Sequence, residues 1–161
     1  MFFQRIIALT FLLSISADVV LADKPTDLVV EPFVLRSPHE SAPEFGAPRF
    51  GKLAFLGGIT LRSSNPAFGG LSALRVAPDG QQALALSDRG RFWDFALNYD
   101  QNGRLAGAKL LGNFRMQTNV DGKPISDGMR DSESMEWSGD GGVLVGFEHQ
   151  HRIWRFPPSN K

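Results

Sequence analysis

The clearest hydrophobic pattern in the chain is an alternation close to its centre. Apolar side chains occupy every second position there: Trp93, Phe95, Leu97 and Tyr99. Successive side chains point to opposite faces in a strand, so a period of two predicts β-structure. Outside the N-terminus no window has a helical stripe, and 17 glycines and 10 prolines would interrupt one. We therefore expect an all-β domain of antiparallel sheets.

A stretch of sequence occurs twice, with a constant offset of 61 residues and no gap. The first copy is LSALRVAPDGQQALALSDRGRFWDF from Leu71, and the second is SESMEWSGDGGVLVGFEHQHRIWRF from Ser132. The offset aligns identical or similar residues: Asp79-Gly80 with Asp140-Gly141, Leu84 with Val145, Arg91 with Arg152, Trp93 with Trp154, and Phe95 with Phe156. Repetition at a fixed spacing indicates one supersecondary unit used twice.

Glycine-containing dipeptides separate the apolar runs. They are Asp79-Gly80, Asn102-Gly103, Asp121-Gly122 and Asp140-Gly141. Glycine supplies the positive φ that a two-residue hairpin turn requires. We therefore predict two-residue hairpins within both copies of the repeat, and a meander of antiparallel strands.

Residues 1–22 have the pattern of a cleaved secretory signal. Arg5 gives a weakly positive start, residues 6–13 form an apolar run too short to span a bilayer, and small residues up to Ala22 offer a cleavage site. A buried N-terminal helix is the alternative, but Asp18 and the DKPTD segment that follows leave it without distinct polar and apolar faces. We predict a secreted or periplasmic chain.

Composition narrows the choice of compartment and partner. The chain has no cysteine, so an exported form needs no disulfides, which suits a bacterial periplasm. Its 17 basic and 17 acidic residues give a net charge of +0. Binding to a nucleic-acid backbone needs a basic stripe, so we expect no nucleic-acid partner, and no membrane span either.

The segment before the repeats divides into two parts. Residues 23–50 are rich in Pro, Ser, Glu and Ala with little periodicity, which predicts a linker or a surface arm. From Lys52 the pattern becomes β-like, with apolar residues on both sides of Gly57-Gly58. One bent strand or two short strands would explain it.

Five motifs in sequence order carry a resemblance to a known family: FLGGITL, FGGLSALRVAPDG, ALSDRGRFW, DSESMEW and FEHQHRIWRFP. Over about residues 52–157 the chain resembles the bacterial phytase-like family, "esterase-like activity of phytase". The resemblance implies a β-propeller, in which four-stranded blades surround a central channel. At roughly 40 to 45 residues per blade, residues 51–158 would form a partial propeller of about two blades plus an N-terminal strand.

A partial propeller leaves sheet edges and blade faces uncovered. We therefore expect a truncated member of the family, a fragment, or self-association through the open edges to complete a ring. By resemblance, residues 50–62 would be an outer strand of the closing blade, with its partner strands missing from this chain.

Acidic side chains recur where strands of the repeats begin or turn. Asp131 and Glu133 open the first strand of the second copy, Asp88 and Arg89 lie in a turn of the first copy, and Glu148 and His149 lie in the equivalent turn of the second. Converging carboxylates suit Ca²⁺, which takes six to eight oxygen ligands. A metal with carboxylates could bind and polarise a phosphate ester for attack by water. The resemblance strengthens the pair Asp131 and Glu133, which belong to the family motif.

We take Asp131, Glu133, Asp88 and Arg89 as candidate catalytic residues, and Asp131, Glu133 and Glu148 as candidate metal ligands. A solvated acidic loop is the alternative for Asp131 and Glu133, and a plain turn with a local ion pair is the alternative for Asp88 and Arg89.

Other candidates receive structural interpretations. Glu136 alternates away from Glu133, which predicts an exposed or ion-paired side chain. His149 and His151 would share one face of a strand as a possible metal pair, although a polar surface is the favoured interpretation. Ser72 lacks the second glycine of a nucleophile elbow and precedes a strand, so we reject it as a nucleophile.

The aromatic residues of the repeat recur at one position of each copy, which predicts packing between blades. Trp137 could line the channel or fill the core. The leading functional hypothesis is metal-assisted hydrolysis of phosphate esters or other esters in a small molecule. The alternatives are a non-catalytic binding module and a truncated product without function.

Overall fold

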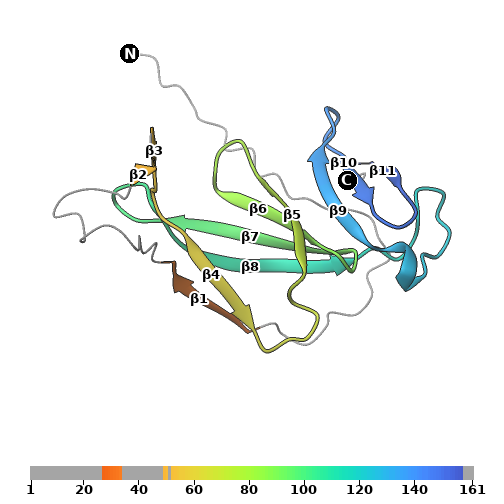
Figure 1. Ribbon diagram of the computed structural model, residues 1–161, viewed down its shortest axis with the longest axis horizontal. Coiled ribbons are helices and arrows are strands. Elements are labelled where there is room, and N and C mark those ends of the chain that lie inside the picture. Colours follow the sequence, from red (N-terminus) through yellow and green to blue (C-terminus); the bar gives the residue numbers. More distant parts are fainter. Residues whose placement is uncertain (1–26, 34–48, 51, 158–161) are drawn as a thin grey trace, which may run out of the picture.

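The structure is a computed structural model that describes residues 27–33, 49–50 and 52–157 (Figure 1). The predicted signal peptide and much of the predicted arm lie outside these residues. Within them, the chain is built from β-strands and one 3-10 helix, η1, Asp127–Met129. No helix in the described part has the length and hydropathy to span a bilayer. The predicted all-β class is confirmed for this part of the chain.

The two copies of the repeat form two separate antiparallel sheets (Figure 1). The four-stranded sheet has the order β5 (Leu71–Val76), β6 (Gln82–Ser87), β7 (Arg91–Tyr99) and β8 (Leu105–Arg115). The three-stranded sheet consists of β9 (Ser132–Trp137), β10 (Val143–Phe147) and β11 (Arg152–Phe156). Strands β9, β10 and β11 begin 61 residues after β5, β6 and β7, so the repeat predicted from the sequence is confirmed.

The hairpins within the repeats are longer than the two residues that we predicted. Gly80 and Gly141 have φ of 73° and 86°, as expected of a left-handed turn position. However, Ala77 N–H bonds to Gln82 O, whereas Ser138 N–H bonds to Gly142 O. Each glycine is the last residue of a four-residue turn, a position that type I turns favour for glycine.

The difference between these two loops displaces β10 by one residue. Ala85 pairs with Leu74 and Trp93, whereas Val145 pairs with Met135 and Trp154. Val145 therefore occupies the sheet position of Ala85, and not that of Leu84 as the gapless alignment had it. A shift of one residue moves every side chain of a strand to the other face. The aligned pairs of β9 and β11 keep their predicted positions.

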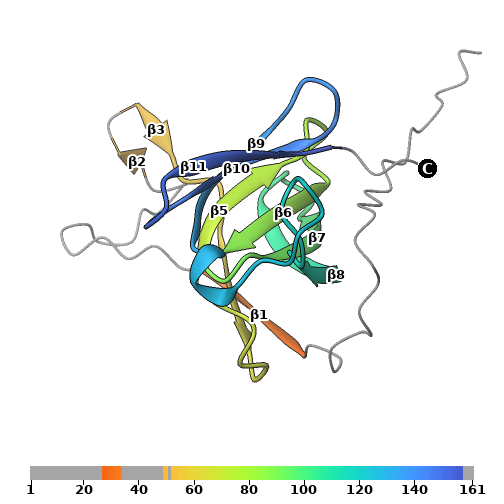
Figure 2. The ribbon, with the colours of Figure 1, turned by 90° about the vertical axis from the view of Figure 1, so that its right-hand side faces the viewer.

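The two sheets pack face to face and enclose the main core (Figure 2). The four-stranded sheet contributes Leu84, Leu86 and Phe92. The three-stranded sheet contributes buried Met135, Val143, Val145 and Phe147, with Trp137, Trp154 and Phe156 packed beside them. The predicted packing role of Trp154 and Phe156 is confirmed, and Trp137 contributes to the core.

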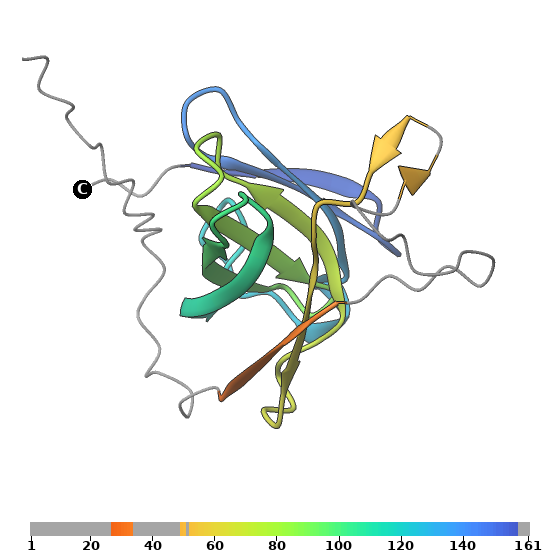
Figure 3. The ribbon, with the colours of Figure 1, turned by 90° about the vertical axis from the view of Figure 1, so that its left-hand side faces the viewer.

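The opposite face of the four-stranded sheet holds a second cluster. Ala85, Trp93 and Phe95 are buried there, and Phe68 contacts Trp93 edge to face at 5.0 Å between ring centroids. Trp93 and Phe95 thus pack on the side away from the three-stranded sheet. Strand β4 (Ile59–Ser63) lies on the same side and contributes Leu61 (Figure 3).

The N-terminal strands correct the expectation that residues 50–62 form an outer strand whose partner strands are missing from this chain. Strand β1 (Leu28–Pro32) pairs with β4, and β2 (Arg49–Phe50) pairs with β3 (Leu53–Ala54). The β-like pattern after Lys52 is therefore two short strands, and β4 has a partner within this chain. That partner comes from the predicted linker or arm. The described residues close no barrel, and the propeller stays a prediction.

Candidate functional site

Two serines hold the first strands of the two sheets together. The Ser72 hydroxyl donates to the carbonyl oxygen of Ser132 at 2.5 Å, and the buried Ser132 hydroxyl donates to that of Ser87 at 2.7 Å. These bonds link β5, β9 and the end of β6. Ser72 thus has a structural role. The acidic residues selected from the sequence lie directly beside these bonds, at Asp88, Asp131 and Glu133.

Asp131, Glu148 and His149 form a group that could hold a metal ion. Each offers one ligand atom, and these atoms lie within 4.8 Å of one another. His149 Nε2 is 2.9 Å from Asp131 Oδ2, and Glu148 N–H donates to Asp131 O at 2.8 Å. The β10–β11 turn therefore folds back onto the residue that precedes β9.

His149 has an unusual backbone. Its φ of 56° makes it the one non-glycine residue with positive φ in the described part of the chain. Such a conformation is uncommon for a residue with a side chain and requires support from its surroundings. His149 and His151 lie in the turn and not on one face of a strand, which corrects our prediction. His151 is exposed and does not belong to the group with Asp131 and Glu148.

Glu133 lies in the field of three other carboxylates. Loss of solvation raises the pKa of Glu133, and the negative charges of Asp131, Glu148 and Asp88 raise it further. A hydrogen bond with Asp131 acts in the same direction. Charge interactions with Glu133 thus connect Asp88, Asp131, Glu133 and Glu148, which we call the acidic cluster, with His149 at its edge. The group whose ligand atoms lie within 4.8 Å of one another contains Asp131 and Glu148 but neither Glu133 nor Asp88.

Asp88 is seated against the backbone of Gly70. Gly70 has φ of 58°, and a Cβ built on it would overlap the Asp88 carboxylate. Asp88 N–H donates to Gly70 O at 2.8 Å. The buried atom Asp88 Oδ1 has no hydrogen-bond partner among the described residues. An oxygen in this position could accept a cation or a donor of a ligand.

Arg89 forms the local ion pair that was the alternative to a catalytic role. Its Nε lies 3.8 Å from Asp88 Oδ1, and its Nη1 donates to Pro66 O at 3.1 Å. The side chain is still 61% exposed. Arg89 is thus the cation next to the acidic cluster, and a phosphate oxygen could reach it.

Glu136 and His149 are two exposed residues beside or near the acidic cluster for which the sequence predicted a surface position. Glu136 pairs with Arg75 at 2.9 Å and its side chain is 58% exposed, in agreement with the predicted exposed or ion-paired side chain. The side chain of His149 is 72% exposed, which agrees with the favoured surface interpretation, and its Nε2 also contacts Asp131. The structure places Glu148 and His149 at the turn positions equivalent to Asp88 and Arg89, as predicted: Glu148 N–H bonds to Asp131 O just as Asp88 N–H bonds to Gly70 O.

Comparison with known proteins agrees with the resemblance that the five sequence motifs indicated. Residues 66–161 match the Phytase-like family, described as "Esterase-like activity of phytase". The match includes every residue of the acidic cluster and both copies of the repeat, and it begins later than the resemblance noted from residue 52. No curated protein and no solved structure matches the chain significantly. The chain belongs to the phytase-like family.

Proposed function

We propose that the chain is an exported hydrolase of phosphate esters or other esters, and that its acidic cluster holds a divalent cation, most suitably Ca²⁺. The observation that carries the proposal is the convergence of four carboxylates from separate turns and strands, where loss of solvation and the neighbouring negative charges raise the pKa of Glu133. Export is supported by the signal-like residues 1–22. The repeat of antiparallel sheets supports a propeller, with each sheet as a blade.

The residues present fit a cation. Asp131 and Glu148 offer oxygens within 4.8 Å of each other, and Asp88 offers a buried oxygen with no hydrogen-bond partner among the described residues. A bound cation would offset the negative charge by which these carboxylates raise the pKa of Glu133. Oxygen ligands favour Ca²⁺, whereas the imidazole of His149 would suit Zn²⁺ better.

The residues around the cluster would divide the work of hydrolysis. A bound cation would supply positive charge to polarise an ester or phosphoryl oxygen. Glu133 would accept a proton from the attacking water, because its carboxylate hydrogen-bonds with Asp131, one of the residues that would hold the cation. The exposed guanidinium of Arg89 would bind the anionic oxygens of a phosphate group.

Thermal melting with and without Ca²⁺ tests the cation site. A ligand that binds only the native state stabilises it by RT ln(1 + [L]/Kd), about 2.7 kcal/mol at a hundredfold excess over Kd. We expect Ca²⁺ to raise the Tm of the wild type and Glu133→Gln to remove most of the rise. Glu136→Gln is the matched control, because Glu136 is on the same strand but pairs with Arg75. An unchanged Tm with Ca²⁺ in the wild type would contradict the site.

Hydrolysis of an aryl phosphate and an aryl ester tests the activity. We expect the wild type to hydrolyse at least one of them, and Glu133→Gln to lose about a hundredfold or more of that rate, the usual contribution of a general base. Glu136→Gln should retain the rate. Binding of Ca²⁺ without hydrolysis of either substrate would instead favour a non-catalytic binding module.

A further inference from the structure

Arg130 is a buried cation that directly precedes Asp131 in the chain. The residue is 6% exposed. Its Nε donates a hydrogen bond to Met116 O at 2.8 Å, and its Nη1 pairs with the carboxylate of Asp127. Loss of solvation lowers the pKa of Arg130, and the positive charge of Arg115 lowers it further. Burial is costly for a charge, and the two acceptors offset part of that cost and fix the guanidinium in one place.

The aliphatic part of the Arg130 side chain lies against the turn that carries Asp88. A Cβ built on Gly90 would lie 3.1 Å from Arg130 Cβ and 3.3 Å from Arg130 Cδ. Gly90 has φ of 66° and no side chain, so Arg130 can approach its backbone. Met116, which accepts the hydrogen bond from Arg130, donates its own N–H to Gly90 O at 2.8 Å. Arg130, Met116 and Gly90 thus join the residue before Asp131, the end of β8 and the Asp88 turn.

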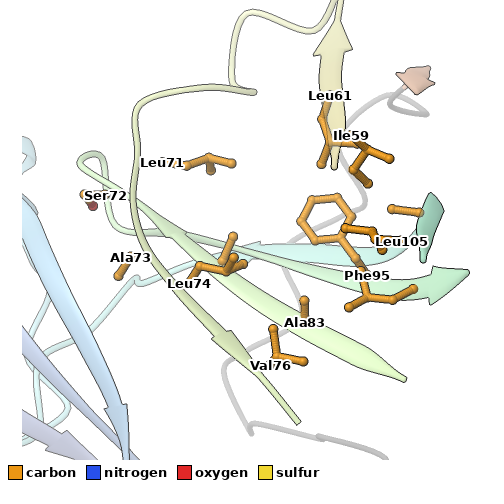
Figure 4. Close-up of a pocket in the computed structure, with 13 residues that line it drawn as sticks. Ile59, Leu61, Leu71, Ser72, Ala73, Leu74, Val76, Ala83, Phe95 and Leu105 are labelled. Carbon is orange, nitrogen blue, oxygen red and sulfur yellow. The ribbon is translucent and has the colours of Figure 1, made fainter. Parts of the chain in front are cut away.

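Ser132 holds the other side of Asp131 to the same turn. Its hydroxyl donates to Ser87 O at 2.7 Å, and its carbonyl oxygen accepts from the Ser72 hydroxyl at 2.5 Å. Ser72 lies beside a groove of about 440 Å³, whose lining in the described part of the chain is apolar apart from this serine (Figure 4). On this side the backbone is therefore held by neutral hydrogen bonds, whereas Arg130 holds the other side with a charged group.

Asp131 thus has a buried neighbour on each side in sequence, and both neighbours contact the turn of Asp88. We propose that Arg130 is a positioning residue, which fixes the carboxylate of Asp131 relative to that of Asp88. Its guanidinium faces Met116 and Asp127, so Arg130 acts on the site through the backbone that it holds. The inference rests on the proposed function, because it concerns the same cation site.

Charge and position predict opposite effects when Arg130 loses its charge. A positive charge near a cation weakens its binding, so removal of the charge alone should strengthen the binding of Ca²⁺. Arg130→Met retains an unbranched side chain and removes the guanidinium. We expect this variant to bind Ca²⁺ about tenfold to a hundredfold more weakly, the usual effect of removing a group that orients a metal ligand. Isothermal titration calorimetry of the folded chain with Ca²⁺ measures the Kd.

Arg115→Met is the matched control for the loss of charge. Arg115 Nη2 also pairs with Asp127, at 2.8 Å, but Arg115 is the last residue of β8 and has no place beside Asp131 in the chain. The variant should bind Ca²⁺ as tightly as the wild type or more tightly. Equal weakening in Arg115→Met and Arg130→Met would overturn the proposal, because the shared Asp127 and not the contact of Arg130 with the turn would then be responsible.

Gly90→Ala tests the same contact if Arg130→Met proves unfolded by circular dichroism. Its new Cβ would press on Arg130 Cβ, so we expect weaker binding of Ca²⁺ again. Gly103→Ala introduces a side chain at a similar φ of 72° with no atom within 4 Å, and should leave the Kd unchanged. A Kd for Gly90→Ala equal to that of Gly103→Ala would contradict the role of Arg130.

Amide hydrogen exchange tests the positioning without a metal. Glu148 N–H donates to Asp131 O at 2.8 Å, so Arg130→Met should reduce the protection of the Glu148 amide. Ala77 N–H, which bonds to Gln82 O at the opposite end of β5, should keep its protection. Loss of protection at Glu148 without binding of Ca²⁺ to the wild type would contradict the proposed function and support the positioning role. Unchanged protection at Glu148, or a Kd in Arg130→Met at or below that of the wild type, would overturn the positioning role.

Discussion

The buried hydroxyl of Ser132 donates a hydrogen bond to the carbonyl oxygen of Ser87, 2.7 Å away. This bond joins the first strand of the second repeat to the turn that carries Asp88. Asp131 and Glu133 flank Ser132 in sequence, so the same bond sets the spacing between carboxylates that come from different sheets. The acidic cluster therefore depends on contacts between the two repeats.

Ser132→Ala should destabilise the fold. The substitution removes one of two donors to the carbonyl of Ser87, because Gly90 N–H donates to the same oxygen at 2.9 Å. The loss of one such hydrogen bond costs about 0.5 to 1.5 kcal/mol. Urea unfolding measures the free energy change. Ser134→Ala, an exposed change on the same strand, should alter the free energy of unfolding by less than about 0.5 kcal/mol. Equal effects of the two substitutions would show that the bond contributes nothing.

Gly70→Ala should displace Asp88. The new Cβ would overlap the Asp88 carboxylate, and the φ of 58° adds backbone strain of about 1 to 2 kcal/mol. We expect a lower free energy of unfolding and a smaller Ca²⁺-induced rise in Tm. Gly103→Ala separates the two effects, because Gly103 has a similar φ of 72° but no atom within 4 Å of the added Cβ. It should lower stability and leave the Ca²⁺ response unchanged.

Short-range patterns made the strands of the repeat predictable. The alternation from Trp93 to Tyr99 and the recurrence of Asp-Gly depend only on neighbouring residues in the sequence. The alternation lies in β7, and the Asp-Gly pairs lie in turns. The packing of Trp154 followed from recurrence at one position of the repeat. Strand alternation also separated Glu136 from Glu133, which predicted an exposed or ion-paired side chain for Glu136.

Features that depend on contacts between residues distant in the sequence could not be predicted from these local patterns. The register of β10 depends on a one-residue difference between the β5–β6 and β9–β10 loops. The gapless alignment therefore matched Val145 with Leu84, although Val145 occupies the sheet position of Ala85, which is on the other face. Strand β1 forms because β4 offers it an edge, which residues 28–32 alone do not reveal. The contact between His149 and Asp131 needs a left-handed backbone at a histidine. Histidine adopts this conformation more readily than most residues, but it remains uncommon, so the sequence does not place it at this position.

Asp94 should make stability depend on pH. Burial raises the pKa of Asp94 above its ordinary value of 3.8, although a hydrogen bond from the backbone of Phe95 opposes the rise. The folded state then holds the proton more tightly than the unfolded state. This contribution is fully present below the unfolded pKa and is lost as pH rises through the folded pKa.

Asp94→Asn removes that dependence. Relative to the wild type, the variant should gain stability between pH 3.5 and 7, as measured by urea unfolding at both values. Asp100 provides a control of opposite sign, because backbone hydrogen bonds led by that of Arg104 lower its pKa. Asp100→Asn should therefore lose stability relative to the wild type as pH rises over the same range. Parallel pH profiles of the wild type and Asp94→Asn would refute the role of burial.

His149→Asn should distinguish a carboxylate site for Ca²⁺ from a mixed site for Zn²⁺. Asparagine tolerates the positive φ of this position, so the turn should retain its shape. Its side chain lacks the imidazole nitrogen that Zn²⁺ prefers, whereas the carboxylates that suit Ca²⁺ remain. Thermal melting with each metal should show a retained rise in Tm for Ca²⁺ and no rise for Zn²⁺. His151→Asn, in the same turn but outside the group with Asp131, should respond to both metals as the wild type does. If His149→Asn abolished the response to Ca²⁺ while leaving the fold intact, the imidazole and not the carboxylates alone would hold the cation.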